Sequence, residues 1–206
     1  ERNAHPMVSN DTVAVVHNGI IENHAELREE LRTQGYAFTS DTDTEVMAHL
    51  IHAIHSRGTT LLDAVKQVLP RLHGAYAIAV VSTREPGVVV GARKGSPMVM
   101  GLGEGEQYLA SDIHALLPVT RRFVYLAEGD IAEIRIDGTR VFDAEGREIV
   151  RPVKEAHFSA DAVQRGEYRH YMLKEIHEQP AAIADTLEGR LSGGHVLTQI
   201  FGPSAQ

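Results

Sequence analysis

The chain has 206 residues, 43% of them hydrophobic, which is enough to bury the core of one domain with an appendage. Its 28 acidic and 20 basic residues give a net charge of -8, which argues against non-specific nucleic-acid binding. The apolar runs are far shorter than the roughly 20 residues that span a membrane, so we predict a cytoplasmic protein with no membrane or nucleic-acid partner.

Three helices are predicted in the first third of the chain. Asn23, with Glu26 three positions later, forms a capping-box pattern that starts a helix running to about Gln34. A second helix is expected to begin near Thr44 and a third directly after Thr60, each with apolar residues along one face.

From residue 75 onward the hydrophobic period changes to the alternation that is typical of strands. Turn sequences such as Asp137-Gly138 separate these strands and favour hairpins. The predicted strands cover residues 13–17, 76–82, 88–92, 97–101, 107–110, 123–126, 131–136 and 139–142. Helices grouped early and strands joined by hairpins predict an α+β fold with antiparallel sheets.

The stretch HNGIIEN, residues 17–23, places an Asn-Gly pair at the end of the first predicted strand. The side-chain amide of Asn18 and the unhindered backbone N–H of Gly19 are donors that can stabilise a developing oxyanion with little reorganisation. A tight hairpin turn is the usual meaning of an isolated Asn-Gly pair and is the structural alternative.

Together with SDTDTE at residues 40–45 and NAHP at residues 3–6, this stretch resembles the glutaminase domain of the class II glutamine amidotransferases. In that family an amino-terminal Cys attacks the side-chain amide of glutamine, and its own α-amino group acts as the base. The resemblance implies a four-layer αββα sandwich of the N-terminal-nucleophile hydrolase type. Because the chain contains no Cys, we interpret the domain as incomplete at its N-terminus and expect this chain alone not to hydrolyse glutamine.

The resemblance also implies roles for four residues. Asn18 and Gly19 would be the catalytic donors to the tetrahedral oxyanion. Asp43 would bind the α-ammonium group of glutamine, and His5 occupies a family position close to the glutamine pocket.

Each of these roles has a structural alternative. Asp41 or Asp43 could instead cap the second helix and complement its dipole, and we interpret Asp41 and Glu45 as structural residues. His5 could be a solvated side chain near a chain start. His17 is interpreted as a hydrogen-bonded structural histidine, because the rest of its strand is apolar.

The twelve histidines raise the question of a metal site. His49, His52 and His55 are spaced by three on the second helix, where the first and the last point about 240° apart and cannot converge on one ion. The Gly-rich run at 101–105 lacks Lys and Ser/Thr, so it is read as a hairpin loop and not as a phosphate site. No metal and no cofactor are predicted.

The segment FSADAVQRGEYRHYMLKEIHEQP, residues 158–180, resembles the connector of one branch of this family. We therefore assign residues 1–157 to a partial glutaminase domain and residues 158–206 to the connector and the start of a sugar-isomerase domain. Members of this branch convert fructose 6-phosphate and glutamine to glucosamine 6-phosphate and glutamate.

The branch implies that the parent protein passes ammonia to a C-terminal isomerase half and forms a homodimer. Two alternatives stay open at this point. One is a non-catalytic module that binds glutamine or another protein, and the other is a class II amidotransferase with a different acceptor.

Overall fold

The computed structural model describes residues 2–156, 166, 168–187, 191–192 and 195–196. The chain divides into two units, Glu1–Phe158 and Ser159–Gln206, and each is described by itself. The first unit contains the helices α1 (His24–Thr33), α2 (Asp43–His55) and α3 (Leu61–Val68), and the short 3-10 helices Leu69–Arg71 and Ile113–Ala115. The second contains α4 (Tyr171–Leu187), β12 (Leu191–Ser192) and β13 (His195–Val196).

Two antiparallel sheets complete the first unit. The larger has seven strands in the order β1 (Met7–Ser9), β2 (Val13–Ile21), β3 (Gly74–Ser82), β4 (Val89–Lys94), β8 (Ile131–Arg135), β9 (Gly138–Phe142) and β10 (Glu148–Ile149). The smaller has four, in the order β11 (Val153–Glu155), β7 (Arg122–Tyr125), β5 (Val99–Leu102) and β6 (Gln107–Ala110). Every pairing within these sheets is antiparallel, which confirms the predicted α+β class.

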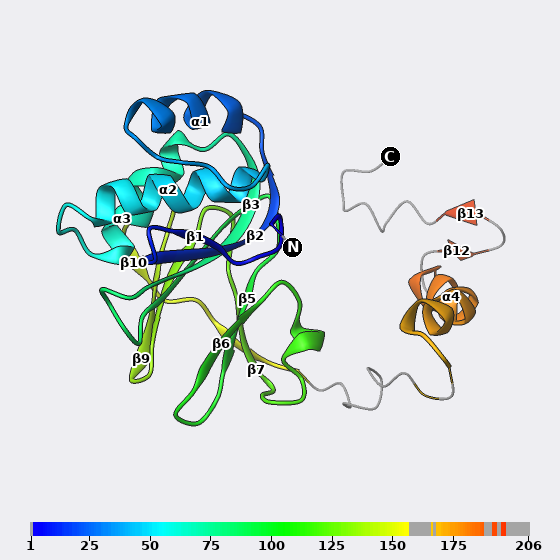
Figure 1. Ribbon diagram of the computed structural model, residues 1–206. Helices are drawn as coiled ribbons and strands as arrows, with labels where there is room; N and C mark the ends of the chain where they lie inside the picture. The colour runs from blue at the N-terminus through cyan, green and yellow to red at the C-terminus, as the bar shows by residue number, and fades with distance from the viewer. Residues whose placement is uncertain (1, 157–165, 167, 188–190, 193–194, 197–206) are drawn as a thin grey trace. The chain divides into compact units, whose positions relative to one another are not determined.

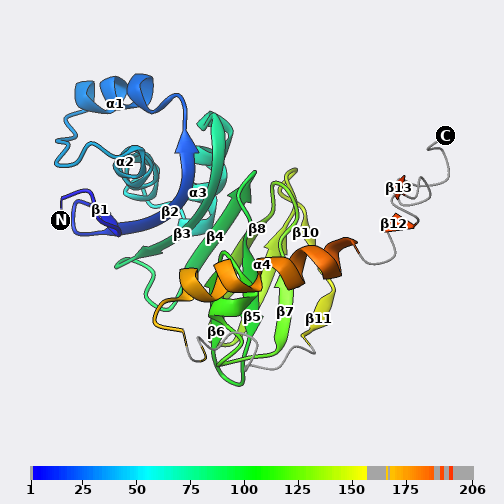
Figure 2. The ribbon, with the colours of Figure 1, turned by 90° about the vertical axis from the view of Figure 1, so that its right-hand side faces the viewer.

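The elements are arranged in layers. The three helices lie together on one face of the large sheet, and β5, β6 and β7 lie on the other side of it (Figure 1). Figure 2 shows the same separation from the side, with the helices next to β2 and β3. Residues 2–156 thus form the helix, sheet and sheet layers of the predicted sandwich. Within that range no α-helix covers the outer face of the small sheet.

Alternation along β2 explains this layering. Val13, Val15 and Ile21 are fully buried in the core cluster that joins the large sheet to the helices. Between them Val16 is exposed and points to the opposite face, because successive side chains of a strand alternate. The core between the two sheets is a second cluster, formed by Ala77, Met98, Met100, Val124, Leu126, Ala132, Ile134 and Val141.

The first predicted strand was too short. β2 continues through Asn18 and Gly19 to Ile21 and pairs with β3 along its whole length, from Val13↔Ser82 to Ile21↔Gly74. The Asn-Gly pair therefore lies inside a strand, and the hairpin-turn alternative is wrong. β1 pairs with β2 only over residues 13–15, and no strand of the described residues pairs with that edge of β2 from residue 16 onward.

The capping predictions had mixed outcomes. Thr60 caps α3 as expected, and its hydroxyl accepts from the N–H of Asp63 at 3.1 Å. The capping box at Asn23 is wrong: its side chain makes no cap bond and instead donates to the Arg71 carbonyl at 2.9 Å and accepts from the His73 N–H at 3.0 Å. This amide joins the start of α1 to the segment before β3, where it satisfies two backbone groups.

The strands β1, β10 and β11 were not predicted, because runs of two or three residues carry too little alternation. Much of the predicted connector, residues 157–165 and 167, lies outside the described residues. Its later part forms α4, which contains Pro180. No helix in the described part of the chain combines the length and the apolar character needed to cross a bilayer.

Candidate active site

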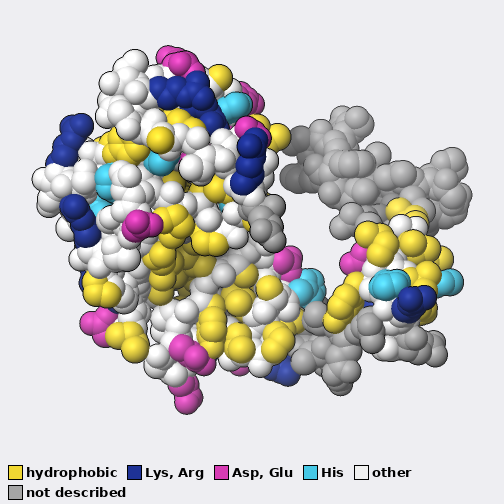
Figure 3. All heavy atoms as spheres, viewed as in Figure 1, with side chains coloured by type: hydrophobic (Ala, Val, Ile, Leu, Met, Phe, Trp, Pro, Cys, Tyr) yellow, Lys and Arg dark blue, Asp and Glu magenta, His cyan; other side chains and the backbone are white. Residues whose placement is uncertain are grey.

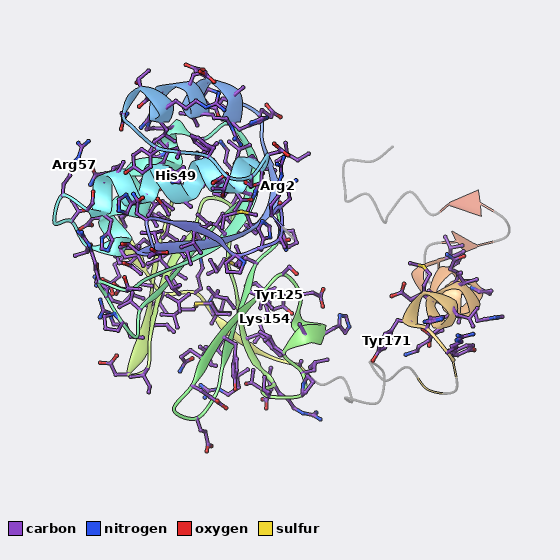
Figure 4. The ribbon with its side chains drawn as sticks, viewed as in Figure 1. Arg2, His49, Arg57, Tyr125, Lys154 and Tyr171 are labelled. Carbon is purple, nitrogen blue, oxygen red and sulfur yellow. The ribbon has the colours of Figure 1, made fainter. Side chains whose placement is uncertain are left out.

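Three motifs that are distant in the sequence meet at the start of α2. The N–H of Asp41 donates to the side chain of Asn3 at 3.2 Å, and Arg2 forms an ion pair with Asp41. Nε2 of His5 lies 3.0 Å from the hydroxyl of Thr44. The NAHP segment is thereby held against SDTDTE, and Arg2 marks this end of α2 in Figure 4.

The strand that carries the Asn-Gly pair is tied to the same helix end. The N–H of Ile21 donates to Oδ2 of Asp43 at 2.8 Å. On the same strand, Nδ1 of His17 lies 3.2 Å from the Thr44 hydroxyl and 3.8 Å from Oδ1 of Asp43. The cap of α2 is neither Asp41 nor Asp43, because the Thr42 hydroxyl accepts from the N–H of Glu45 at 3.3 Å. The Asp43 carboxylate therefore bridges strand and helix.

Two adjoining hollows contain the predicted site residues. The first, of about 420 Å³, is lined by Asn3, His5, His17, Gly19, Ile20, His24, Asp41, Thr42, Asp43 and Thr44. The second, of about 180 Å³, is lined by His5, Val16, His17, Asn18, Ala77, Ala79, Met98, Leu109, Ala110 and Ser111. They share His5 and His17. All four predicted residues, Asn18, Gly19, Asp43 and His5, line one hollow or both, so the fold brings them together.

Asn18 presents an unused amide to the second hollow. Its side chain is exposed and has no hydrogen-bond partner among the described residues. It stands opposite Ala77 of β3, whose small side chain leaves room beside the carboxamide. The hollow is partly apolar, because Val16, Ala77, Ala79, Met98 and Leu109 line it together with Asn18. Hydrophobic side chains are also exposed on the face of the molecule seen in Figure 3.

Gly19 occupies a position that only glycine can take. Its φ is +135°, and an added Cβ would lie 2.1 Å from the carbonyl oxygen of Ala75. In a strand the N–H groups of alternate residues point to the same edge. The N–H of Ile21 reaches Asp43 at the open edge of β2, and from this alternation we expect the N–H of Gly19 at the same edge.

A buried carboxylate shapes the loop before α2. Glu45 is only 2% exposed and accepts four hydrogen bonds, from the N–H and hydroxyl of Thr39 at 2.8 and 2.9 Å and from those of Ser40 at 2.7 Å each. Burial acts to raise the pKa of Glu45, but these donors outweigh it and hold the pKa below its usual range. This geometry matches the structural role expected for Glu45.

Arg28 of α1 supports the same loop from the other side. Its guanidinium donates to the carbonyls of Ser40 at 3.0 Å and Thr42 at 2.7 Å. It also lies over the ring of Phe38, 4.4 Å from the centroid. Asp43, the first residue of α2, therefore directly follows a loop that is held in place by both α1 and α2.

The three histidines of α2 have separate partners. His49 contacts the Ser9 hydroxyl at 2.8 Å and the Ala37 carbonyl at 3.2 Å, and His55 contacts the Ser82 hydroxyl at 2.9 Å. His52 contacts the hydroxyl of Tyr36 at 2.7 Å. In the part of the chain that the structure describes, no group of three or more His, Cys, Asp or Glu side chains is placed to hold a metal ion.

Buried histidines predict a loss of stability in mild acid. Burial lowers the pKa values of His17 and His49, and the carboxylates of Asp43 and Glu45 oppose this only in part. The unfolded chain has histidine pKa values of about 6.5 and so binds more protons than the folded chain just below that pH. The contribution of the two neutral histidines to the stability of the folded chain is complete above about pH 6.5. It is lost as the pH falls toward their lowered pKa values.

The pH dependence of stability is measured as the melting temperature between about pH 5 and pH 8. We expect it to fall on the acid side, and His49→Gln to reduce the pH dependence because one such proton is removed. A melting temperature that rises as the pH falls through this range would contradict the prediction.

Sequence reasoning missed three residues of the site. His17 lines both hollows, Thr44 lines the first, and Ser111 lines the second with Asn18. The inward position of His17 on an otherwise apolar strand was the available signal. Away from the hollows, Arg93 of β4 forms an ion pair with Glu128 at 3.1 Å and joins these two segments of the chain.

A known protein family and several known proteins match this chain. A family model described as a glutamine amidotransferase domain matches residues 1–118. The chain is 57% identical over 205 residues to the glutamine–fructose-6-phosphate aminotransferase (isomerizing) of Pseudomonas putida, and 56% identical over 206 residues to that of Pseudomonas aeruginosa. Each match covers 100% of this chain and 34% of the relative, so the chain spans about a third of their length.

A solved structure shares the fold. The glutamine phosphoribosylpyrophosphate amidotransferase from B. subtilis, complexed with ADP and GMP, matches with a TM-score of 0.57 and 28% identity. The match covers 69% of this chain and 32% of that one. The family model covers more than half of the chain. The chain therefore belongs to the family of glutamine amidotransferase domains.

Proposed function

We propose that this chain forms the glutamine site of an enzyme that uses glutamine and fructose 6-phosphate to make glucosamine 6-phosphate and glutamate. One observation carries the proposal: the free carboxamide of Asn18 and the N–H of Gly19 lie on one strand, and that strand is bonded directly to the carboxylate of Asp43. Oxyanion donors and an ammonium-binding carboxylate are thus held in one rigid frame.

The first hollow binds the α-ammonium end of glutamine and the second binds its carboxamide end. Oδ2 of Asp43 is occupied by the Ile21 N–H, whereas Oδ1 is 3.8 Å from the nearest ring nitrogen of His17 and stays free to bind the α-ammonium of glutamine. The carboxamide end of the substrate then extends toward Asn18. His5, which borders both hollows, contacts the middle of this path.

The chemistry follows from the donors. A thiolate attacks the amide carbon of glutamine, and the carbonyl oxygen becomes an oxyanion that accepts from Asn18 and Gly19. Collapse of this intermediate with a proton on the nitrogen releases ammonia and leaves a thioester, which water hydrolyses to glutamate. Since these 206 residues contain no Cys, the thiol is supplied from outside them.

The acceptor and the remaining architecture are inferred from the relatives. Those matched are named for fructose 6-phosphate and are about three times as long as this chain. We propose a parent protein, meaning the full-length enzyme that contains these residues, in which residues 1–157 are glutaminase and residues 158–206 lead into a C-terminal isomerase half. This half receives the ammonia, and the enzyme is a cytoplasmic homodimer.

The substrate role of Asp43 is tested by Asp43→Asn in the parent protein. The Asn oxygen can still accept from Ile21, so the strand-to-helix bond is kept while the charge is lost. A charge-assisted hydrogen bond contributes about 1.5 to 3 kcal/mol, so we expect KM for glutamine to rise about ten- to hundredfold. The measurement is glutamate release as a function of glutamine concentration.

Glu29→Gln is the matched control, because it removes an equally sized charge from an exposed position on α1. It should leave KM unchanged. Equal KM values for wild type and Asp43→Asn would remove Asp43 from the site. A folded parent protein that binds glutamine without releasing glutamate would instead favour a non-catalytic binding module.

A further inference from the structure

A third hollow lies on the side of the large sheet that faces the helices. Its volume is about 620 Å³, within the roughly 300 to 1,000 Å³ that is usual for small-molecule sites. It shares no lining residue with the two hollows of the candidate active site. Leu69, Pro70 and Ile131 contribute apolar surface to its wall. The hollow is therefore a separate place where a small molecule could bind.

The hydroxyl of Tyr76 lacks a hydrogen-bond partner among the described residues. Tyr76 is only 4% exposed and lines this hollow. Burial and the charge of Glu128, which lines the same hollow, raise the pKa of Tyr76 to about 12, so the phenol keeps its proton at neutral pH. Lys94 is directly opposite Tyr76 in the pairing of β3 with β4, so the two side chains are on the same face of the sheet. An acceptor atom bound in the hollow would satisfy this buried donor.

The two lysines of the hollow are not used in ion pairs. Nζ of Lys66 lies over the ring of Phe142, 3.5 Å from its centroid. Lys66 also interacts at longer range with Glu148, whose carboxylate already accepts from Arg140 at 2.8 Å. In the part of the chain that the structure describes, neither Lys66 nor Lys94 forms an ion pair with a carboxylate. Both ammonium groups can therefore bind an anion.

The two acidic side chains of the hollow already have donors. Glu128 accepts from the guanidinium of Arg93 at 3.1 Å and from the N–H of Gly95 at 2.9 Å. Glu145 accepts from Arg147 at 2.7 Å. Since these carboxylates are paired with arginines and the lysines are not paired with acids, the hollow offers a ligand an excess of positive charge and of hydrogen-bond donors.

We propose that this hollow binds a small phosphate monoester with a partly apolar body. Such a group carries a charge of about -1.5 to -2 at pH 7 and three acceptor oxygens, which suit two ammonium groups and one phenol. A carboxylate has a single charge and two oxygens, so it uses these donors less fully. The apolar wall receives the organic part of the ligand. This inference goes beyond the proposed function and does not depend on it.

The test is calorimetric titration of the parent protein with phenyl phosphate, and with benzoate as the corresponding carboxylate. We expect phenyl phosphate to bind at least about tenfold more tightly. Lys66→Gln removes one charge and should raise the Kd for phenyl phosphate about ten- to hundredfold, as expected for a lost charge-assisted hydrogen bond. Tyr76→Phe removes only the hydroxyl and should raise this Kd about three- to tenfold.

Lys154→Gln is the matched control. Lys154 of β11 also lies over an aromatic ring, that of Tyr125 at 5.3 Å, but it does not line the hollow (Figure 4). This variant should leave the Kd for phenyl phosphate within about twofold of wild type, because an exposed charge outside the site contributes little. Saturating glutamate should also leave the Kd unchanged, because the glutamine hollows are separate.

Four results would overturn the inference. They are no binding of phenyl phosphate by the folded parent protein, equal affinity for benzoate, a Kd that is unchanged in both Lys66→Gln and Tyr76→Phe, and competition by glutamate. An unchanged Kd would place the probe in another phosphate site of the parent protein, and competition would place it in the glutamine hollows. Failure of the parent protein to release glutamate from glutamine would count against the proposed function alone, because this test measures binding without catalysis.

Discussion

Asn18→Ala in the parent protein is expected to lower kcat for glutamine hydrolysis by about 10²- to 10³-fold, the usual cost of losing one oxyanion donor. The Asn18 carboxamide has no partner among the described residues, so its removal breaks no structural bond. The lost interaction forms mainly when the carbonyl oxygen becomes charged, so KM should change far less than kcat.

The measurement is glutamate release under saturating glutamine. Asn18→Asp retains the size of the side chain but removes the N–H donor and adds a negative charge, so it should be at least as damaging as alanine. Val16→Ala is the control, because it changes the same hollow without removing a donor, and it should stay within about threefold of wild type. A similar loss in Val16→Ala would show that the hollow is sensitive to volume and that Asn18 is not a specific donor.

Glu45→Ala is expected to lower the free energy of unfolding by about 1 to 3 kcal/mol, because two backbone N–H groups lose their acceptor and the one that belongs to a buried residue, Ser40, is left unpaired. These are the N–H groups of Thr39 and Ser40, in the loop that leads to Asp43. The variant should therefore also weaken glutamine binding, because the loop that presents the carboxylate of Asp43 loses its anchor.

Stability is measured by urea unfolding of the parent protein, and local order by amide hydrogen exchange at the start of α2. Glu29→Ala removes the same side chain from a position that is 69% exposed and forms an ion pair with Arg32 on the surface. Its effect should stay within about 0.5 kcal/mol. If the two variants had equal unfolding free energies, the buried carboxylate would have no structural role.

Sequence alone was sufficient where the signal is local. Apolar periodicity placed α2, α3 and most strands from β3 onward, and the Thr60 and Asp63 pair marked the start of α3. A cap or an amphipathic face depends on residues three or four positions apart, so a short window contains the whole signal. The three motifs of the site were likewise visible in the sequence, because each is a short contiguous segment.

Contacts between distant segments needed the tertiary structure. Asn23 belongs to a capping-box pattern in the sequence, yet its side-chain amide forms hydrogen bonds with backbone groups of Arg71 and His73, which lie 48 and 50 positions away. The Asn-Gly pair is a dipeptide typical of turns, yet its pairing with β3 keeps it within a strand. In each case a long-range partner satisfies the polar group better than the local arrangement does.

The same distinction applies to the site. The sequence determined which residue types are present, the donors Asn18 and Gly19 and the carboxylate of Asp43. Only the tertiary structure decided that β2 bonds to the start of α2 through Asp43, and that Thr44 stands between His5 and His17. These contacts depend on strand register and helix packing across 22 to 39 positions, where no local pattern specifies which side chains will meet.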